Sequence, residues 1–176
     1  IKRAAVVRDF DEFKRNLNIY VISQNTSGKL LPANTTLKNN LKNWLIQYKV
    51  VNDTIDILDA EIVNFGINYS VAIDLNTNRY TVISRANNAI RDFLIKNQYD
   101  IGESILITDF YKVLQKVNGI IDVVDLEIVG KSGASYASTS FNFTDNLSAD
   151  GRRIEGKNNA VFELKFANID IKGAIR

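Results

Sequence analysis

The feature that most constrains this chain is an alternation of apolar and polar side chains in the segment AEIVNFGINYSVAIDL, which starts at Ala60. Seven apolar side chains occupy its odd-numbered positions: Val63, Phe65, Ile67, Tyr69, Val71, Ile73 and Leu75. The even-numbered positions are polar or small: Asn64, Gly66, Asn68, Ser70, Ala72 and Asp74. Because successive side chains of a strand point to opposite faces, this period of two predicts a long strand with one buried face.

Two amphipathic helices are predicted to cover such a sheet. The first has one apolar face, made of Leu37, Leu41, Trp44, Leu45 and Tyr48. The second follows a turn at Asn76 to Asn78 and packs through Val82, Ala86, Ala89, Ile90, Phe93 and Leu94. The β-branched run from Ile19 to Ser23 predicts another strand, followed by a polar loop from Gln24 to Ala33. Val50 to Asp56 favours a turn and the start of a strand.

The segment from Ile101 to Val129 predicts a loop, a short helix, a glycine stop and a strand. Thr108 is expected to cap the helix, with Asp109 in its first turn. Phe110, Val113, Leu114 and Val117 share one helical face. Asn118-Gly119 ends the helix, because glycine adopts the left-handed conformation without steric cost. In the following strand, Val124, Leu126 and Ile128 are expected to point one way and Asp125 and Glu127 the other.

The two ends of the chain give weaker signals. Asp9 is expected to cap a short helix through Phe10, Phe13 and Leu17, with Glu12 completing a capping box. Beyond Val129 the sequence becomes small and polar, and Phe141 to Phe143 predicts a short strand. A second strand is expected from the alternation of Phe162, Leu164 and Phe166, continued by Ile169 and Ile171. These two strands suggest a β-hairpin or arm.

The order of elements indicates an α+β fold, with helices on one side of a small sheet in a two-layer α/β sandwich. A split β-α-β arrangement resembling the ferredoxin-like fold is the best match for the core. We expect an α/β core domain at residues 1–130 and a β-hairpin-rich C-terminal tail or arm at residues 131–176.

Composition excludes several kinds of chemistry. The 176 residues include no cysteine and no histidine, so disulfides, thiolate zinc sites and histidine general bases are excluded. There is no methionine either, which suggests a fragment of a longer protein. No apolar run reaches the length that spans a membrane, so no membrane partner is expected.

The net charge of +2 conceals an asymmetry along the chain. Residues 1–49 carry nine Lys or Arg and three Asp or Glu, whereas residues 50–129 carry six and twelve. Opposite charge in two parts of one chain suits complementary contact between copies or with neighbouring proteins. Unevenly solvated surface explains the same pattern equally well.

Four segments are candidate functional sites. Gly130-Lys131-Ser132 follows a strand but lacks the glycine five residues before the Gly-Lys pair that a phosphate-binding loop needs, since Asp125 stands there. Asn64 to Tyr69 faintly resembles an RNA-stacking strand, yet Phe65 and Tyr69 share the apolar face. The remaining two segments are the acidic run Asp53, Asp56, Asp59 and Glu61, and the pair Arg152-Arg153.

The acidic run lacks the glycine and spacing of a calcium loop, which favours a solvated loop. The arginine pair suits a carboxylate or phosphate of a partner, or a solvated hairpin tip. Trp44 is expected to pack, with its N–H near a polar rim. No Ser, Thr or Lys has an evident activating base. We therefore predict no catalytic, cofactor-binding or metal-binding residues, and no enzyme.

Three stretches resemble the baseplate J-like family of contractile phage tails. Ile101-Gly102-Glu103, a helix and Val117-Asn118-Gly119-Ile120 are similar to that family's I-G-E segment, helix and V-x-G-V/I strand. Arg3 to Phe10 (RAAVVRDF) resembles its R-A-V-x-x-x-D-Y/F first helix. Leu41 to Phe65 looks most similar to the wedge protein of T-even-like phages, in its C-terminal part.

The resemblance implies a structural subunit of a baseplate wedge, located in the virion at the tail baseplate and assembled in the host cytoplasm. It further implies a homo-oligomer, with dimers joining other wedge proteins in a ring around the tail hub. No cofactor and no nucleic acid are expected. The alternative is a nucleic-acid-binding α/β domain that uses the basic first third of the chain.

Overall fold

The structure, a computed structural model, describes residues 1–8, 16–50 and 54–176. They form two compact units. Unit 1 comprises Ile1–Ile62, Asp100–Glu103 and Lys157–Val161, and unit 2 comprises Val63–Tyr99, Ser104–Gly156 and Phe162–Arg176. The expected division into a core domain (1–130) and a tail (131–176) stays a prediction, because compactness alone does not identify the segments that fold independently.

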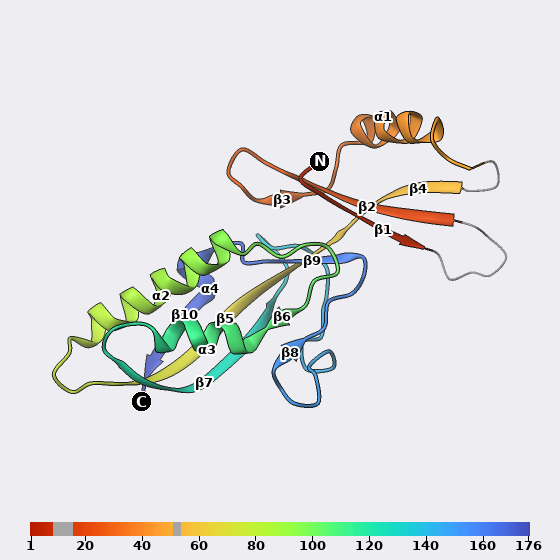
Figure 1. Cartoon of the computed structure of the whole chain (residues 1–176). Coiled ribbons are helices and arrows are strands. Elements are labelled where there is room, and N and C mark those ends of the chain that lie inside the picture. The colour runs from red at the N-terminus through yellow and green to blue at the C-terminus, as the bar shows by residue number, and fades with distance from the viewer. Residues whose placement is uncertain (9–15, 51–53) are drawn as a thin grey trace. The chain divides into compact units, whose positions relative to one another are not determined.

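Unit 1 is a small sheet with one helix against it (Figure 1). Its central strand is β2 (Asn16–Gln24), which confirms the strand predicted at Ile19 to Ser23. Strand β1 (Arg3–Arg8) pairs antiparallel with β2, and β4 (Thr54–Asp59) pairs parallel with β2. The short β3 (Leu30–Leu31) pairs antiparallel with the end of β2, inside the segment expected to be a loop.

Helix α1 (Thr35–Ile46) confirms the first predicted helix. It begins where Asn34 Oδ1 accepts a hydrogen bond from the Thr36 N–H at 2.9 Å. Its Leu41 and Leu45 pack on a buried cluster of Ile19, Val21 and Ala33. A second cluster of unit 1 contains Ile22, Leu30, Ala60 and Val161. Alternate residues of β2 therefore belong to different clusters, as the period of a strand requires.

The N-terminal segment differs from the prediction. Arg3–Arg8 resembled the start of a helix, but it forms strand β1, with Ala5 opposite Tyr20 in the pairing register. The helix predicted from Asp9 falls on residues 9–15, outside the described part of the chain, and Leu17 lies in β2 instead. β1 satisfies backbone hydrogen bonds along an edge of β2 that a helix would leave unpaired.

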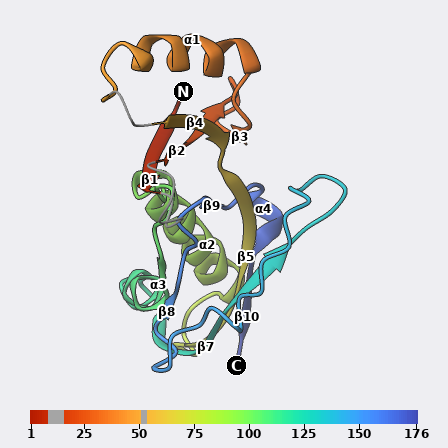
Figure 2. The same ribbon diagram turned by 90° about the vertical axis from the view of Figure 1, so that its right-hand side faces the viewer.

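Unit 2 is built around β5 (Glu61–Ile73). Strand β10 (Ile171–Ile175) pairs parallel with β5, and β7 (Ile120–Lys131) pairs antiparallel with it. Strand β9 (Ala160–Glu163) also pairs with β5. Helices α2 (Arg79–Lys96) and α3 (Ile107–Gln115) lie on one face of this sheet (Figure 2). The predicted α+β class with a two-layer arrangement is confirmed.

The long alternating strand confirms its predicted apolar face. Val63, Phe65, Ile67, Tyr69 and Val71 are each at most 3% exposed. The expectation for Leu75 was wrong, because β5 ends at Ile73 and Leu75 is 94% exposed. Asp74 begins a turn there, with its Oδ1 accepting a hydrogen bond from the Asn76 N–H. Helix α2 then buries Val82, Ala86 and Ile90, as predicted.

Helix α3 confirms the predicted helix but not its predicted cap. Its first residue is Ile107, so Thr108 lies inside the first turn and no side chain caps the helix. Asp109 does lie in the first turn, and Phe110 and Leu114 are fully buried. Gly119 has φ +99°, the left-handed conformation expected at the end of the helix.

Strand β7 departs from simple alternation at two bulges. Ser70 pairs with Asp125 and Val71 with Val123, so Val124 is an extra residue in β7. Val123 is therefore buried and Val124 is 44% exposed, contrary to the prediction for Val124, whereas Leu126 and Ile128 are buried as predicted. A bulge reverses the side-chain direction on one side of it, which a period-two pattern cannot anticipate.

The C-terminal segment does not form the predicted hairpin. Its strands pair with earlier ones, β9 and β10 with β5, and β8 (Arg153–Ile154) with β6 (Ile105–Leu106). Phe141 to Phe143 runs into a turn instead of a strand, although both rings are 9% exposed and pack at 4.9 Å. Ile169 lies in the short helix α4 (Ala167–Asp170) and is 62% exposed. The C-terminal strands therefore extend the sheet of β5 or pair with β6, and the only local pairing among the described residues of this segment is the bridge of Leu147 with Ile154.

Candidate functional site

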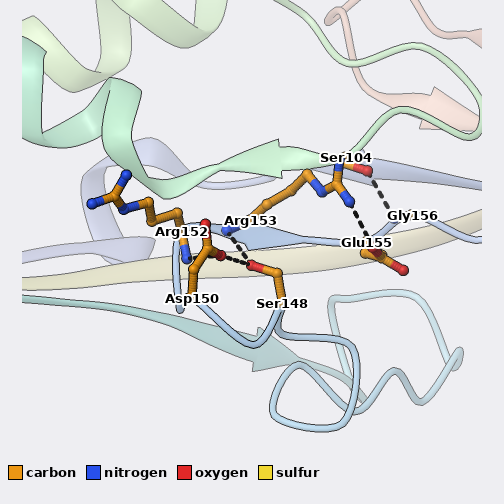
Figure 3. Close-up of polar contacts among 7 residues, drawn as sticks. All are labelled: Ser104, Ser148, Asp150, Arg152, Arg153, Glu155 and Gly156. Atoms are coloured by element: carbon orange, nitrogen blue, oxygen red, sulfur yellow. Dashed lines mark hydrogen bonds and ion pairs between the residues drawn. The ribbon is translucent and has the colours of Figure 1, made fainter.

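The Arg152-Arg153 pair lies in a tight turn between Ser148 and Arg153 (Figure 3). Ser148 Oγ donates to Asp150 Oδ1 and accepts from the Arg153 N–H at 3.0 Å. The Arg152 N–H donates to Asp150 Oδ1 at 3.2 Å, and the Arg152 carbonyl accepts from the Ile107 N–H at 2.9 Å. The turn is therefore held by side-chain and backbone bonds together.

Most charged side chains of this turn form hydrogen bonds or an ion pair with other residues of the same turn. The hydrogen bond from Ser148, followed by the Arg152 N–H, holds the pKa of Asp150 below its usual value. Arg153 Nη2 forms an ion pair with Glu155 Oε1 at 2.7 Å. Arg152 points away from that pair in Figure 3. Both arginines are exposed, but the guanidinium of Arg153 is engaged by Glu155, so the turn is a solvated tip and not a site where both arginines hold one anion.

Gly130-Lys131-Ser132 ends β7 and is not followed by a helix. The chain instead turns through Gly133 and Ala134, both with positive φ. This geometry excludes a phosphate-binding loop leading into a helix N-terminus. The same three residues nevertheless line a cavity of about 210 Å³, together with Thr139 and Ser140.

A buried polar network holds this part of the chain against β5. Asn64, only 1% exposed, accepts the Ala137 N–H at Oδ1 (2.7 Å) and donates through Nδ2 to Glu163 Oε2 (2.9 Å). Asp170, also 1% exposed, accepts the Tyr136 hydroxyl at 2.6 Å and the Phe166 N–H at 2.9 Å. The bond to Asp170, with burial second, raises the pKa of Tyr136 to about 12.

Sequence reasoning did not identify Asn64, Tyr136 or Asp170. Asn64 was expected on the polar face of β5, and a residue on that face was not expected to be buried, whereas Asn64 is 1% exposed. A usable signal was the segment that follows β7, GKSGASYASTS, where one aromatic residue stands among small ones. Small side chains let a backbone approach a sheet closely, and the lone tyrosine then anchors it.

The strand that faintly resembles an RNA-stacking strand offers no stacking surface. Phe65 is fully buried and makes edge-to-face contacts with Tyr99 and Phe162. Tyr69 is 3% exposed and donates its hydroxyl to Asn87 Oδ1 at 2.7 Å, and burial raises its pKa. Bases stack only on exposed rings, so the RNA-domain interpretation is excluded for this strand.

The acidic run is used in structural contacts of unit 1. Asp56 accepts hydrogen bonds from Asn16 and Lys42, and these bonds, that from Asn16 first, lower the pKa of Asp56. Asp59 accepts from Lys38 at 2.7 Å and from the Ala33 N–H at 3.1 Å. Asp53 lies outside the described residues. No group of three or more metal-binding side chains occurs in the part of the chain that the structure describes.

The prediction that Trp44 packs into the protein was wrong. Trp44 is 54% exposed at the C-terminal end of α1, and Tyr48, beyond the end of the helix, is 69% exposed. The two rings contact each other, with centroids 4.8 Å apart. Helix α1 turns Leu41 and Leu45 inward and leaves this aromatic pair on the surface. Exposed aromatic residues are enriched at protein interfaces.

No helix among the described residues is both long and apolar enough to cross a membrane. No protein-family model matches this chain. No curated protein matches it either.

The fold is similar to that of a chain in the cryo-EM structure of the anti-feeding prophage (AFP) baseplate, six-fold symmetrised. The similarity covers 90% of this chain with a TM-score of 0.53, at 12% sequence identity. This chain spans 31% of the length of that chain. The match therefore shows a shared fold for nearly all of this chain, within a longer neighbour.

Proposed function

We propose that this protein is a structural, non-enzymatic subunit of a contractile-tail baseplate. The observation that carries the proposal is the similarity of fold to a baseplate chain over 90% of the sequence. The I-G-E motif at Ile101-Gly102-Glu103 and the glycine stop at Gly119 add independent support from sequence, since both resemble the baseplate J-like family. The proposed location is the tail baseplate of the virion, with assembly in the host cytoplasm.

The finer part of the proposal is a wedge role with self-association. Dimers of this protein would join other wedge proteins in a ring around the tail hub. Opposite charge supports contact between copies, because residues 1–49 have an excess of basic residues and residues 50–129 an excess of acidic ones. The exposed Trp44–Tyr48 pair lies in the basic part, where an aromatic anchor would add apolar contact.

The test is the mass of the full-length protein in solution, measured by light scattering and native mass spectrometry. It is measured alone and then with the other wedge proteins of the same particle. We expect dimers or larger species alone, whose stability falls with added salt, and stable complexes in the mixture. A strict monomer that recruits no wedge protein would overturn the proposal.

A matched pair of variants locates the contact. Trp44→Ala is expected to weaken self-association by about tenfold or more, as for aromatic hot spots. Tyr80→Ala is the control, because Tyr80 is an exposed aromatic residue on another helix, α2. If the two variants have equal effects, self-association does not depend specifically on the α1 surface.

A further inference from the structure

Part of the sheet of unit 2 has one face open to solvent. Helices α2 and α3 pack on the other face (Figure 2), and the open part holds a groove of about 310 Å³. We define this open face by six groove-lining residues on three strands: Asn68 and Ser70 of β5, Asp125 and Glu127 of β7, and Lys172 and Ala174 of β10. The side chains along its middle are short, so another chain can approach the sheet closely.

The open face carries opposite charges along its two margins. Asp125 and Glu127 lie on β7, and Lys172 lies on β10, with all three side chains exposed. In the pairing register, Glu127 and Lys172 are both opposite Asn68, one on each side of β5. Two strand spacings, roughly 10 Å, therefore separate the anion from the cation.

These charges have no counter-ion within the chain. Among the described residues, the side chains of Asp125, Glu127 and Lys172 form no ion pair and no hydrogen bond. A partner of this face would therefore match it best with a cation over β7 and an anion over β10.

A second copy of the same face has this arrangement of charge. When two copies stack about a two-fold axis that runs along the strands, β7 of each copy lies over β10 of the other, and levels along the strands are preserved. Glu127 then faces Lys172 of the second copy, and Lys172 faces Glu127 of the second copy. Asp125 lies two residues further along, beside the same lysine. An axis across the strands would instead place β7 over β7, where like charges meet.

We propose that the open face is the contact between two copies of this chain in a symmetric dimer. This inference rests on the self-association in the proposed function and gives it a contact made of other residues than the Trp44–Tyr48 pair. Sheets that pack face to face lie about 10 Å apart, a gap that a glutamate and a lysine reaching from opposite sides can bridge. Two equivalent Glu127–Lys172 pairs fix the orientation, as the isologous contact of a two-fold dimer requires.

The test reverses one charge at a time in the full chain, with Glu127→Lys and Lys172→Glu. Sedimentation equilibrium measures the dissociation constant of the dimer. Each single variant puts like charges into both contacts, so we expect the dissociation constant to rise by about tenfold or more. An equal mixture of the two variants should form a heterodimer about as tightly as the wild type, because both contacts then join unlike charges.

Two controls accompany these variants. Lys96→Glu makes the same change of net charge at an exposed residue of α2, and it should leave the dimer unchanged. The double variant Glu127→Lys with Lys172→Glu exchanges the charges within one chain and should dimerise like the wild type. Recovery in the mixture and in the double variant separates a lost contact from a misfolded chain.

The inference is overturned if both single variants dimerise as tightly as the wild type, or if mixing them restores nothing. If Trp44→Ala alone then weakens the dimer, self-association stands and its contact lies at α1. Single variants that keep the dimer but lose a wedge protein also overturn the inference, and assign the open face to that protein. A wild-type monomer that still recruits wedge proteins overturns the dimer alone, whereas one that recruits none overturns the proposed function.

Discussion

The two faces of β5 are held by different kinds of interaction. Toward α2 and α3 the strand presents a continuous apolar row, in which Phe65, Ile67 and Val71 are fully buried. On the opposite face it presents Asn64 and Gly66, and there the contacts are direct hydrogen bonds and close backbone approach. The first face is stabilised by area removed from water, and the second by a few positioned polar bonds.

The two faces differ in how much their stability depends on single residues. Many side chains contribute to the stability of an apolar face. Its alternating pattern therefore still predicts the strand when one position deviates. A polar face depends on single residues whose partners lie far away in the sequence, such as Asn64 with Ala137. The three variants that follow measure this contrast directly.

The largest effect is expected for Phe65→Ala. The ring is fully buried between Tyr99 and Phe162, with centroid distances of 6.0 and 6.4 Å, so its removal leaves a cavity. We expect the free energy of unfolding to fall by about 3 to 5 kcal/mol. Urea unfolding measures the change, with the half-exposed Val124→Ala as control. A loss below about 1 kcal/mol, typical of surface sites, would contradict the contrast between the two faces.

A smaller and more local effect is expected for Asn64→Ala. The substitution leaves the part-buried Ala137 N–H without its acceptor, which costs about 1 to 3 kcal/mol. Hydrogen exchange at Ala137 should also become faster, because that amide loses its bond. Asn68→Ala is the matched control, since Asn68 is a half-buried asparagine on the same strand and face. Equal stability and equal exchange in the two variants would show that the polar network is dispensable.

The smallest effect is expected for Tyr136→Phe, and it depends on pH. The pKa of Tyr136 is raised from 10.0 to about 12 in the folded chain, because the hydroxyl donates to Asp170. The neutral hydroxyl therefore stabilises the fold fully below the unfolded pKa, and this contribution is lost as pH rises through the folded pKa.

The measurement compares the free energy of unfolding of wild type and Tyr136→Phe across that range. We expect a difference of about 1 kcal/mol at neutral pH that shrinks between pH 10.0 and about 12. Tyr80→Phe, at an 88% exposed position, should change stability little. A difference between wild type and Tyr136→Phe that stays constant with pH would show that the bond to Asp170 does not link titration to folding.

Much of the fold was predictable because its signals are local. The alternation in β5, the apolar stripes of α2 and α3 and the stop at Gly119 depend on neighbouring residues alone. The failures involve distant partners. Arg3–Arg8 becomes a strand because β2 offers an edge, and Val124 turns outward because β7 carries an extra residue relative to β5.

The candidate site was less predictable for the same reason. Gly130-Lys131-Ser132 was rejected correctly as a phosphate-binding loop, but its cavity exists only because Thr139 and Ser140 return beside it. Trp44 was expected to pack because it shares a helical face with Leu41 and Leu45. Leu41 and Leu45 pack on the cluster of Ile19, Val21 and Ala33 while Trp44 is 54% exposed, and sequence periodicity does not report how far the opposing surface extends.

The parallel pairing of β10 with β5 has a consequence for how the chain matures. During synthesis, β5 emerges long before Ile171–Ile175, the segment that completes its sheet on that side. Until then a strand rich in Val, Ile and aromatic residues has an open edge, the kind of template that recruits other chains. The nascent protein is therefore most vulnerable to misassembly just before β10 arrives, and a variant lacking β10 would remain in that vulnerable condition.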